Sequence, residues 1–372
     1  LKKYLIIKEI DIYNFVFRLH SKITVYALLF FSILVSATSI FGTEIDCVIG
    51  AKEGIIRKST VDNFCWILGT YISRKAVSGT KIGQSLVQIG IDLKKINDED
   101  KLYQKYYQWI VFVLILQAFM FSIPAYIWKQ WEGGRLKLIC KDLCSPIVDV
   151  QKWDEGRKDF LVKYVKTHKR FFGPYLTRFI ISELLNFIIL IANILFVNIL
   201  FSGFWISYTP AIQSLLTFDG NKWMTESSRV FPKVAKCDFH YTGPSGSVNI
   251  IDALCLLPLN IVNEKVFAFI WIWFIVLMAI STINLVFQFF LLTFRSFRIH
   301  ILGKYLQRSD SNEVKKLTNN GAAGECFILY QLSRNLNEEI FREILDEIIL
   351  GTSSKHITKN GKNISDDDEY DA

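Results

Sequence analysis

The chain has few histidines and lacks the common sequence motifs of enzyme active sites. It contains no His-Glu-x-x-His pair, no P-loop and no glycine-rich dinucleotide fingerprint. Its five histidines are isolated along the chain: His20, His168, His240, His300 and His356. Cys140 and Cys144 form a lone cysteine pair one helical turn apart; a metal site would need further ligands, and we interpret the two as reduced thiols. We therefore expect no enzyme activity, no metal, no cofactor and no nucleic-acid partner.

Lysine and arginine are missing from four long apolar stretches. The chain of 372 residues is 51% hydrophobic and 15% aromatic, a composition typical of integral membrane proteins. A helix needs about 20 mostly apolar residues to cross a bilayer. Glu183 is the only charged residue in the stretches that qualify, which are 23–41, 107–127, 179–201 and 266–294. The sequence predicts an all-α membrane protein with a bundle of four transmembrane helices.

The distribution of charge predicts the orientation of these spans. Residues 1–22 carry five Lys/Arg against two Asp/Glu, and within the loop 128–178 there are twelve against six, as is typical of cytosolic segments. Four spans then place both termini in the cytosol, with a helical region 295–350 and an acidic tail 351–372 that we expect to be disordered. The outer loop 42–106 also holds ten Lys/Arg, but at this length charge no longer controls translocation.

Four cysteines support the same orientation. Cys47 and Cys65 follow the first span, Cys237 and Cys255 follow the third, and the two pairs have the same spacing. Stable disulfides form in oxidising compartments, so these cysteines predict that the loops 42–106 and 202–265 are extracellular, cross-linked and partly β-stranded.

Several motifs identify a family. Tyr107-Gln108-Trp109 opens the second span, and Pro124 lies near its inner end, where it is expected to kink the helix. Further motifs are Trp131–Arg135, Arg229–Cys237, Gly243–Ser247 and Leu254–Lys265. From about Phe15 to Ile349 the chain resembles the innexins, the gap-junction proteins of invertebrates. It departs from them at its first residues, which lack the usual glycines and serines, and at Cys326, where the family usually has tryptophan.

The resemblance implies a large-pore channel built as a ring of subunits. In innexins of known architecture the ring is an octamer, and it docks with a ring in the adjacent cell, so that ions and small metabolites pass between cells at gap junctions of the plasma membrane. Two alternatives stay open: an undocked, pannexin-like hemichannel, and a four-span adhesion or scaffold protein. The outer loops carry no N-x-Ser/Thr glycosylation site, because the only match is Asn363-Ile364-Ser365 in the tail, and this favours docking.

Four cysteines allow three pairings. The equal spacing favours Cys47 with Cys255 and Cys65 with Cys237, and the family resemblance implies the same bridges. One bridge within each loop is the alternative. Either arrangement would stiffen the loops for contact with a second ring.

Candidate pore-lining residues lie at the outer half of the first span. Ser32, Ser36 and Ser39 recur at helical spacing, and this stripe fits either a water-filled lumen or close helix packing. Glu44 and Asp46 follow directly and are candidates for acidic rings at the mouth of a pore, or for solvated loop charges.

Polar and aromatic residues near the ends of the spans give further expectations. Glu183 lies one turn from the end of the third span, so we expect its side chain to reach the membrane interface. Trp109, Trp128 and Trp131 flank the second span and are expected in the headgroup region, where membrane lipid is their partner. The amphipathic stretch 312–350 is expected to pack on residues 152–170 as a cytosolic helical dome.

Overall fold

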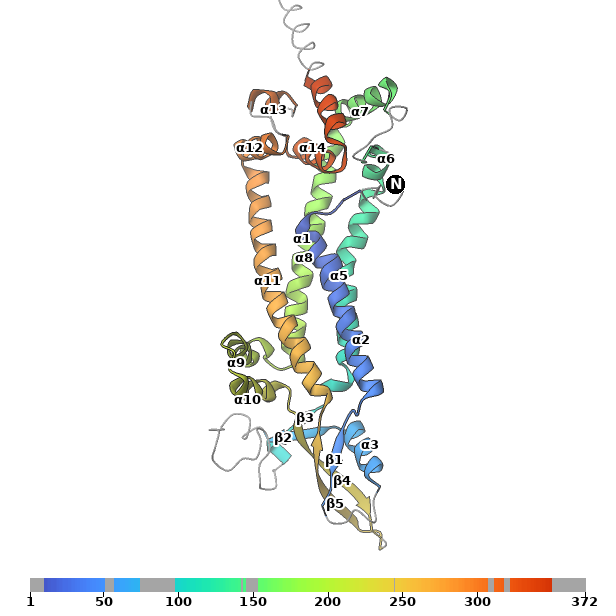
Figure 1. Cartoon of the computed structure of the whole chain (residues 1–372), viewed down its shortest axis with the longest axis vertical. Coiled ribbons are helices and arrows are strands. Elements are labelled where there is room, and N and C mark those ends of the chain that lie inside the picture. Colours follow the sequence, from blue (N-terminus) through green and yellow to red (C-terminus); the bar gives the residue numbers. More distant parts are fainter. Residues whose placement is uncertain are drawn as a thin grey trace, which may run out of the picture. The chain divides into compact units, whose positions relative to one another are not determined.

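The computed structural model describes residues 10–50, 57–73, 98–141, 143–144, 153–243, 245–306, 311–317 and 322–349 (Figure 1). The expected tail 351–372 lies outside the described residues. The chain divides into two compact units, which are treated separately below. The first comprises residues 1–21, 123–187 and 279–372, and the second comprises residues 22–122 and 188–278.

Among the described residues, four helices are long and apolar enough to cross a membrane, as the sequence predicts. The first, Phe15–Phe41, consists of α1 (Phe15–Arg18), a π-helical turn (Leu19–Thr24) and α2 (Val25–Phe41). The others are α5 (Ile110–Glu132), α8 (Lys169–Leu200) and α11 (Leu259–Thr293). Three of the four begin seven to ten residues before the predicted windows, because polar residues at the ends of a span continue the helix beyond the hydrocarbon.

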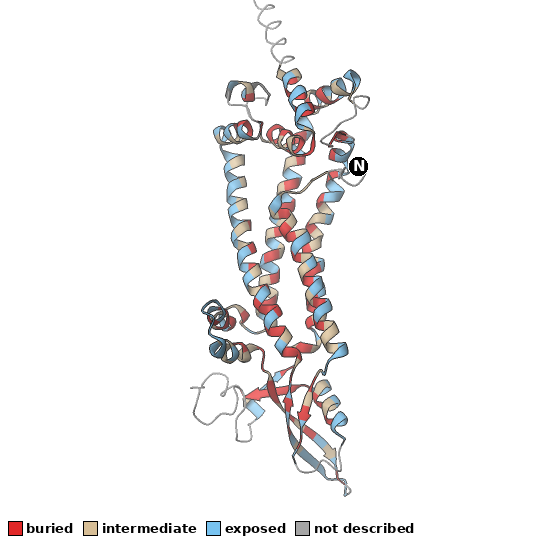
Figure 2. Cartoon of the chain, viewed as in Figure 1, coloured by how far each residue is buried: buried red, intermediate tan, exposed pale blue. Residues whose placement is uncertain are grey.

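Each spanning helix leaves apolar side chains uncovered (Figure 2). Ile33, Phe119 and Ile283 are each more than 60% exposed. A soluble chain would be penalised for such surfaces, whereas lipid or neighbouring subunits cover them in a membrane channel.

The first unit contains a helical domain beyond the spans. Its helices surround one buried apolar cluster, which includes Leu161 and Val165 as well as Leu329 and Leu332. This is the packing that the amphipathic pattern of the sequence predicts for the dome. The helices of this domain are α6 (Arg135–Ile139), α7 (Glu155–Thr167), α12 (Arg295–Tyr305), α13 (Ser311–Leu317), α14 (Ala323–Asn335) and a last helix over residues 338–349.

Trp128 belongs to this cluster and not to the headgroup region, which corrects the expectation from sequence. Its side chain is fully buried, packs on Tyr175 and Phe179, and donates from Nε1 to the carbonyl of Ile12. Trp109 is 60% exposed and fits the interfacial position.

Helix α14 approaches α8 closely at Gly324. A Cβ atom at this position would lie only 2.5 Å from the main-chain carbon of Phe172. We therefore expect Gly324→Ala to lower the stability of this domain by about 1–3 kcal/mol, since backbone cannot move aside as a side chain can. Thermal unfolding of the purified protein measures the loss. Gly173→Ala, on the facing helix, has no atom within 4 Å of its Cβ and should change little beyond helix propensity; equal losses in both variants would contradict the packing.

The second unit contains a five-stranded sheet in the order β1-β5-β4-β2-β3. All of the described pairings are antiparallel. The strands come from both predicted outer loops: β1 (Asp46–Val48), β2 (Thr70–Ser73), β3 (Lys101–Gln104), β4 (Val234–Thr242) and β5 (Val248–Leu256). The described parts of the loops also contain the helices α3 (Lys58–Leu68), α9 (Phe204–Leu216) and α10 (Gly220–Val230) and a short 3₁₀ turn, Asp98–Asp100. A second 3₁₀ turn, Tyr106–Gln108, leads into α5.

Candidate functional site

Two disulfides join the outer loops to each other. Cys47 on β1 faces Cys255 on β5 in the strand register and is bonded to it. Cys65 on α3 is bonded to Cys237 on β4. All four cysteines are buried in an apolar cluster. Both bridges therefore link the first loop to the second, and the alternative of one bridge within each loop is absent from the structure.

The hairpin of β4 and β5 forms the centre of this sheet. It pairs nine residues on each strand, from Val234 opposite Leu256 to Thr242 opposite Val248. Its turn uses Gly246, whose φ of 78° favours glycine, and Gly243 donates its N–H to the carbonyl of Ser247. A long paired hairpin anchored by disulfides is a stiff element on which a recognition surface can be built.

A polar network connects β4 to β2 and β3. The Asp238 carboxylate accepts hydrogen bonds from Tyr71 Oη at 2.7 Å and from Lys101 Nζ at 2.9 Å. Burial by itself would raise the pKa of Asp238, but these two hydrogen bonds and the charge of Lys101 outweigh it, so the pKa lies below its usual value. Asp252 stands opposite Asp238 in the register and is paired with Lys236. Each carboxylate of this like-charged pair therefore has its own lysine.

Because the pKa of Asp238 is lowered, the stability of the folded sheet should depend on pH in a direction that can be tested. Its ion pair stabilises the folded sheet at pH values above the unfolded pKa of about 3.9, and the stabilisation is lost as pH falls through the lower folded pKa. Asp238→Asn should remove this pH-dependent stabilisation. At neutral pH it should lower the free energy of unfolding by at most about 1 kcal/mol, because the carboxylate is partly solvated. Unfolding temperatures measured between pH 7 and pH 3 test it. Asp252→Asn, on an exposed carboxylate, is the control, and an equal response would contradict the assignment.

The comparison with known proteins agrees with this architecture. The Innexin family profile matches residues 13–351 of the chain. The chain is 45% identical to Innexin inx4 of Anopheles gambiae over 349 residues, which are 94% of this chain and 89% of that protein. It is 38% identical to Innexin inx2 of Drosophila melanogaster, with 92% of each protein covered, and 38% identical to Innexin inx4 of the same fly, with 94% of each covered.

The chain belongs to the innexin family. Innexins are subunits of gap-junction channels, so the protein is a multi-pass membrane protein of gap junctions and a channel subunit.

The innexin signature Tyr107-Gln108-Trp109 fastens the first outer loop to the second span. The ring of Tyr107 stacks on Trp66 of α3 at a centroid distance of 4.6 Å, and Gln108 Nε2 donates to the Trp66 carbonyl at 2.6 Å. Trp109 remains exposed. Pro124 lies inside α5 and removes one backbone donor from that helix.

The candidate pore residues of this innexin differ in their surroundings. Ser32 is 4% exposed and its hydroxyl faces the carbonyl of Val111, so within one subunit it packs between helices. Ser36 is half-buried, and Ser39, also half-buried, donates to Glu44 at 2.7 Å. Asp46 forms an ion pair with Lys58.

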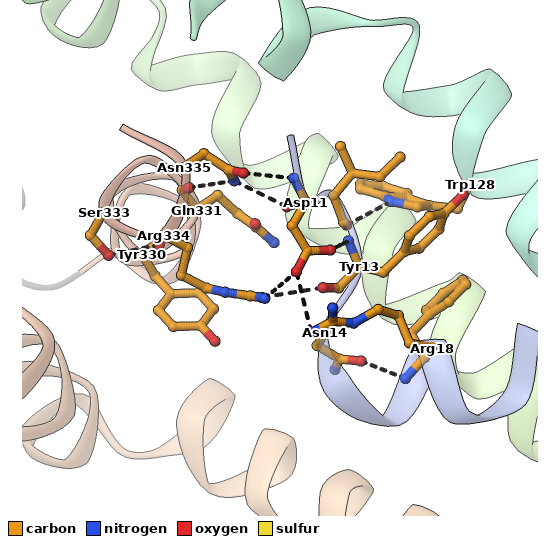
Figure 3. A network of polar contacts seen from close by, with 12 residues as sticks. Asp11, Tyr13, Asn14, Arg18, Trp128, Tyr330, Gln331, Ser333, Arg334 and Asn335 are labelled. Carbon is orange, nitrogen blue, oxygen red and sulfur yellow. Dashed lines mark hydrogen bonds and ion pairs between the residues drawn. The ribbon is translucent and has the colours of Figure 1, made fainter. Parts of the chain in front are cut away.

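An anchor for the N-terminal segment was not foreseen from the innexin sequence (Figure 3). Asp11 exchanges two hydrogen bonds with the side chain of Asn335, and its carboxylate pairs with Arg334 at 2.5 Å and Arg18 at 3.3 Å. Arg334 also donates to the carbonyl of Tyr13. Helix α14 near the C-terminus therefore holds residues 11–13, which lead into the first span. Partners more than 300 residues apart leave no signal in a single sequence.

Glu183 is part of this anchor and does not reach the membrane interface, contrary to the expectation from sequence. Its side chain is 5% exposed and accepts hydrogen bonds from Asn14, at the N-terminus of α1, and from Asn284 of α11. Among the described residues no lysine or arginine forms an ion pair with it. His20 bonds to Ser281 close by at 2.6 Å.

The remaining cysteines fit a structural role. Cys140 and Cys144 are buried; Cys144 Sγ donates to the Cys140 carbonyl, and this proximity together with burial raises the pKa of Cys140. A thiol with a raised pKa is a poor nucleophile and a poor metal ligand. Among the described residues, the cysteines that come close enough for a metal are Cys47, Cys65 and Cys255, whose sulfurs are already in disulfides.

Proposed function

We propose that this innexin assembles as an octameric ring and that its disulfide-linked sheet docks with the sheet of a ring in the adjacent cell. The observation that carries the proposal is the pair of bridges from the first outer loop to the second, which make one stiff unit of two separate loops. A stiff surface loses little conformational entropy when it binds, and this favours sealed contact between two rings. The excess of lysine and arginine in segments 1–22 and 128–178 supports cytosolic termini.

The outer end of the first span is our proposed pore mouth. Ser36, Ser39, Glu44 and Asp46 are half-buried polar residues there, and repetition in every subunit would turn each into a ring. A ring of carboxylates concentrates negative potential between low-dielectric walls and favours cations. Ser32 is buried against the second span and is not included in the lining.

Cysteine accessibility tests this lining. We expect Ser36→Cys and Ser39→Cys to react with a water-soluble thiol reagent in open channels and to lower conductance, because the reagent needs both water and a thiolate. Val35→Cys is the control, since Val35 is completely buried, and Ser32→Cys should be protected as well. Protection at all four positions would place the lumen elsewhere.

The function itself is tested in paired cells. Expression in both cells should give junctional current, and electron microscopy of the purified protein should show rings joined end to end. Dye uptake by single cells without junctional current would instead support an undocked hemichannel. Neither dye uptake nor current, in protein that reaches the surface, would support the adhesion or scaffold alternative.

A further inference from the structure

A cavity of about 290 Å³ lies within the first unit, among the N-terminal turn, α8, α11, α12 and α14. Its walls are mainly apolar and include Phe15, Phe179, Leu291 and Phe327. Phe287 and Leu292 also line it and are each about two-fifths exposed, at 41% and 42%, so the cavity opens on the surface of the subunit. Because α11 ends at Thr293, the opening lies beside the end of a membrane span.

Two amide side chains in the cavity have buried polar atoms without a hydrogen-bond partner in the protein. Gln331 is completely buried, and neither its Nε2 nor its Oε1 forms a hydrogen bond; Gln288 Oε1 is buried and unpaired as well. In Figure 3 no dashed line reaches the Gln331 amide, although its main-chain carbonyl accepts a hydrogen bond from Asn335. A buried amide without a partner is costly, so this pair indicates a ligand that carries a polar group as well as an apolar body.

A basic helix, α12, forms part of the cavity wall. Helix α12 carries Arg295, Arg298, His300 and Lys304 and contains no Asp or Glu. Arg298 reaches the cavity wall and donates to the carbonyls of Leu291 and Leu292 at the end of the span. The other three side chains are exposed. An amphipathic basic helix at the end of a span is suited to bind anionic headgroups of the cytosolic leaflet.

We propose that this cavity binds one membrane phospholipid with an anionic headgroup. One acyl chain fills the apolar space, an ester carbonyl accepts from Gln331 Nε2, and the phosphate lies against the basic face of α12. The assignment rests on the orientation proposed above, which puts this end of the spans at the cytosolic leaflet. Because Asn14, Phe15 and Val16 also line the cavity, the bound lipid supports the turn that begins the first span.

Photolabelling of the full chain tests the site. The purified protein is reconstituted in phosphatidylcholine vesicles that contain phosphatidylserine with a diazirine on its acyl chain, and labelled peptides are identified by mass spectrometry. We expect label on residues 323–331 of α14, several-fold stronger than with a phosphatidylcholine probe and competed by unlabelled phosphatidylserine. Helix α14 lies outside the predicted spans, so an acyl chain contacts it only through the cavity. Label confined to the spans, or equal label with both probes, would overturn the proposal.

Matched variants distinguish labelling that depends on the cavity from labelling at the membrane surface. Cys326 lines the cavity, so Cys326→Trp should fill it and reduce labelling of α14 several-fold. Ile283→Trp is the control, because Ile283 is 69% exposed on α11 and does not line the cavity. If Cys326→Trp fails to fold, Arg295→Glu with Lys304→Glu tests the headgroup alone and should abolish the preference for phosphatidylserine.

The competing occupant is a neighbouring subunit. A cross-linker attached to Cys326 that joins it to any residue of the adjacent subunit would show that another copy covers the cavity, and it would overturn the lipid assignment. This failure differs from failure of the proposed function. Paired rings without label on α14 refute only the lipid, and label without paired rings refutes only docking.

Discussion

Cys47→Ser is expected to abolish junctional current in paired cells. The substitution breaks the bridge from β1 to β5 and leaves Cys255 as a buried, unpaired thiol in the centre of the sheet. Loss of a disulfide in a small extracellular domain typically costs about 2–5 kcal/mol, which is comparable to the whole stability of such a unit. Because the bridge joins the two loops, we expect the loss to disorder the docking surface as a whole.

Further cysteine variants and mass spectrometry test whether loss of the disulfide causes the loss of current. Cys65→Ser should have a similar effect through the second bridge, whereas Cys144→Ser, which removes a cysteine outside both bridges, should keep the current. Mass spectrometry of unreduced protein should show a peptide pair that joins Cys47 to Cys255. A pair that joins Cys47 to Cys65, or normal current in Cys47→Ser, would contradict this account.

Trp128→Ala is expected to destabilise the first unit by about 3–5 kcal/mol, the usual cost of removing a large aromatic side chain from a core. The fully buried ring packs on Tyr175 and Phe179, and its N–H holds the Ile12 carbonyl. We therefore expect a lower unfolding temperature together with faster hydrogen exchange of residues 10–14. A detached N-terminal segment should also alter channel gating, because it leads directly into the first span.

Two further variants distinguish the contribution of Trp128 packing from that of its hydrogen bond to Ile12. Trp128→Phe keeps most of the packing but loses the hydrogen bond to Ile12, so it should mainly speed exchange in the N-terminal segment. Trp131→Ala, three residues further along α5 at a position that is 37% exposed, should cost much less. Equal destabilisation by Trp131→Ala would show that Trp128 has no special role in the core.

Much of the architecture could be predicted from sequence. The four spans are visible because hydrocarbon accepts only long segments without lysine or arginine, a property that each segment carries by itself. The Tyr107-Gln108-Trp109 motif identified the family because these residues follow one another in the chain. The amphipathic helices of the dome were also predictable, since a helical period requires only local sequence.

The tertiary structure alone decided which distant residues meet. Trp128 and Glu183 lie near the ends of apolar segments, where local reasoning predicts the membrane interface, yet both are buried by Ile12, Asn14 and other partners far away in the chain. The equal cysteine spacing favoured the bridges between the loops without excluding the alternative, and the structure pairs Cys47 with Cys255 across β1 and β5. Local hydrophobicity determines where each helix forms, but burial depends on which segments pack together, and that is a property of the folded chain.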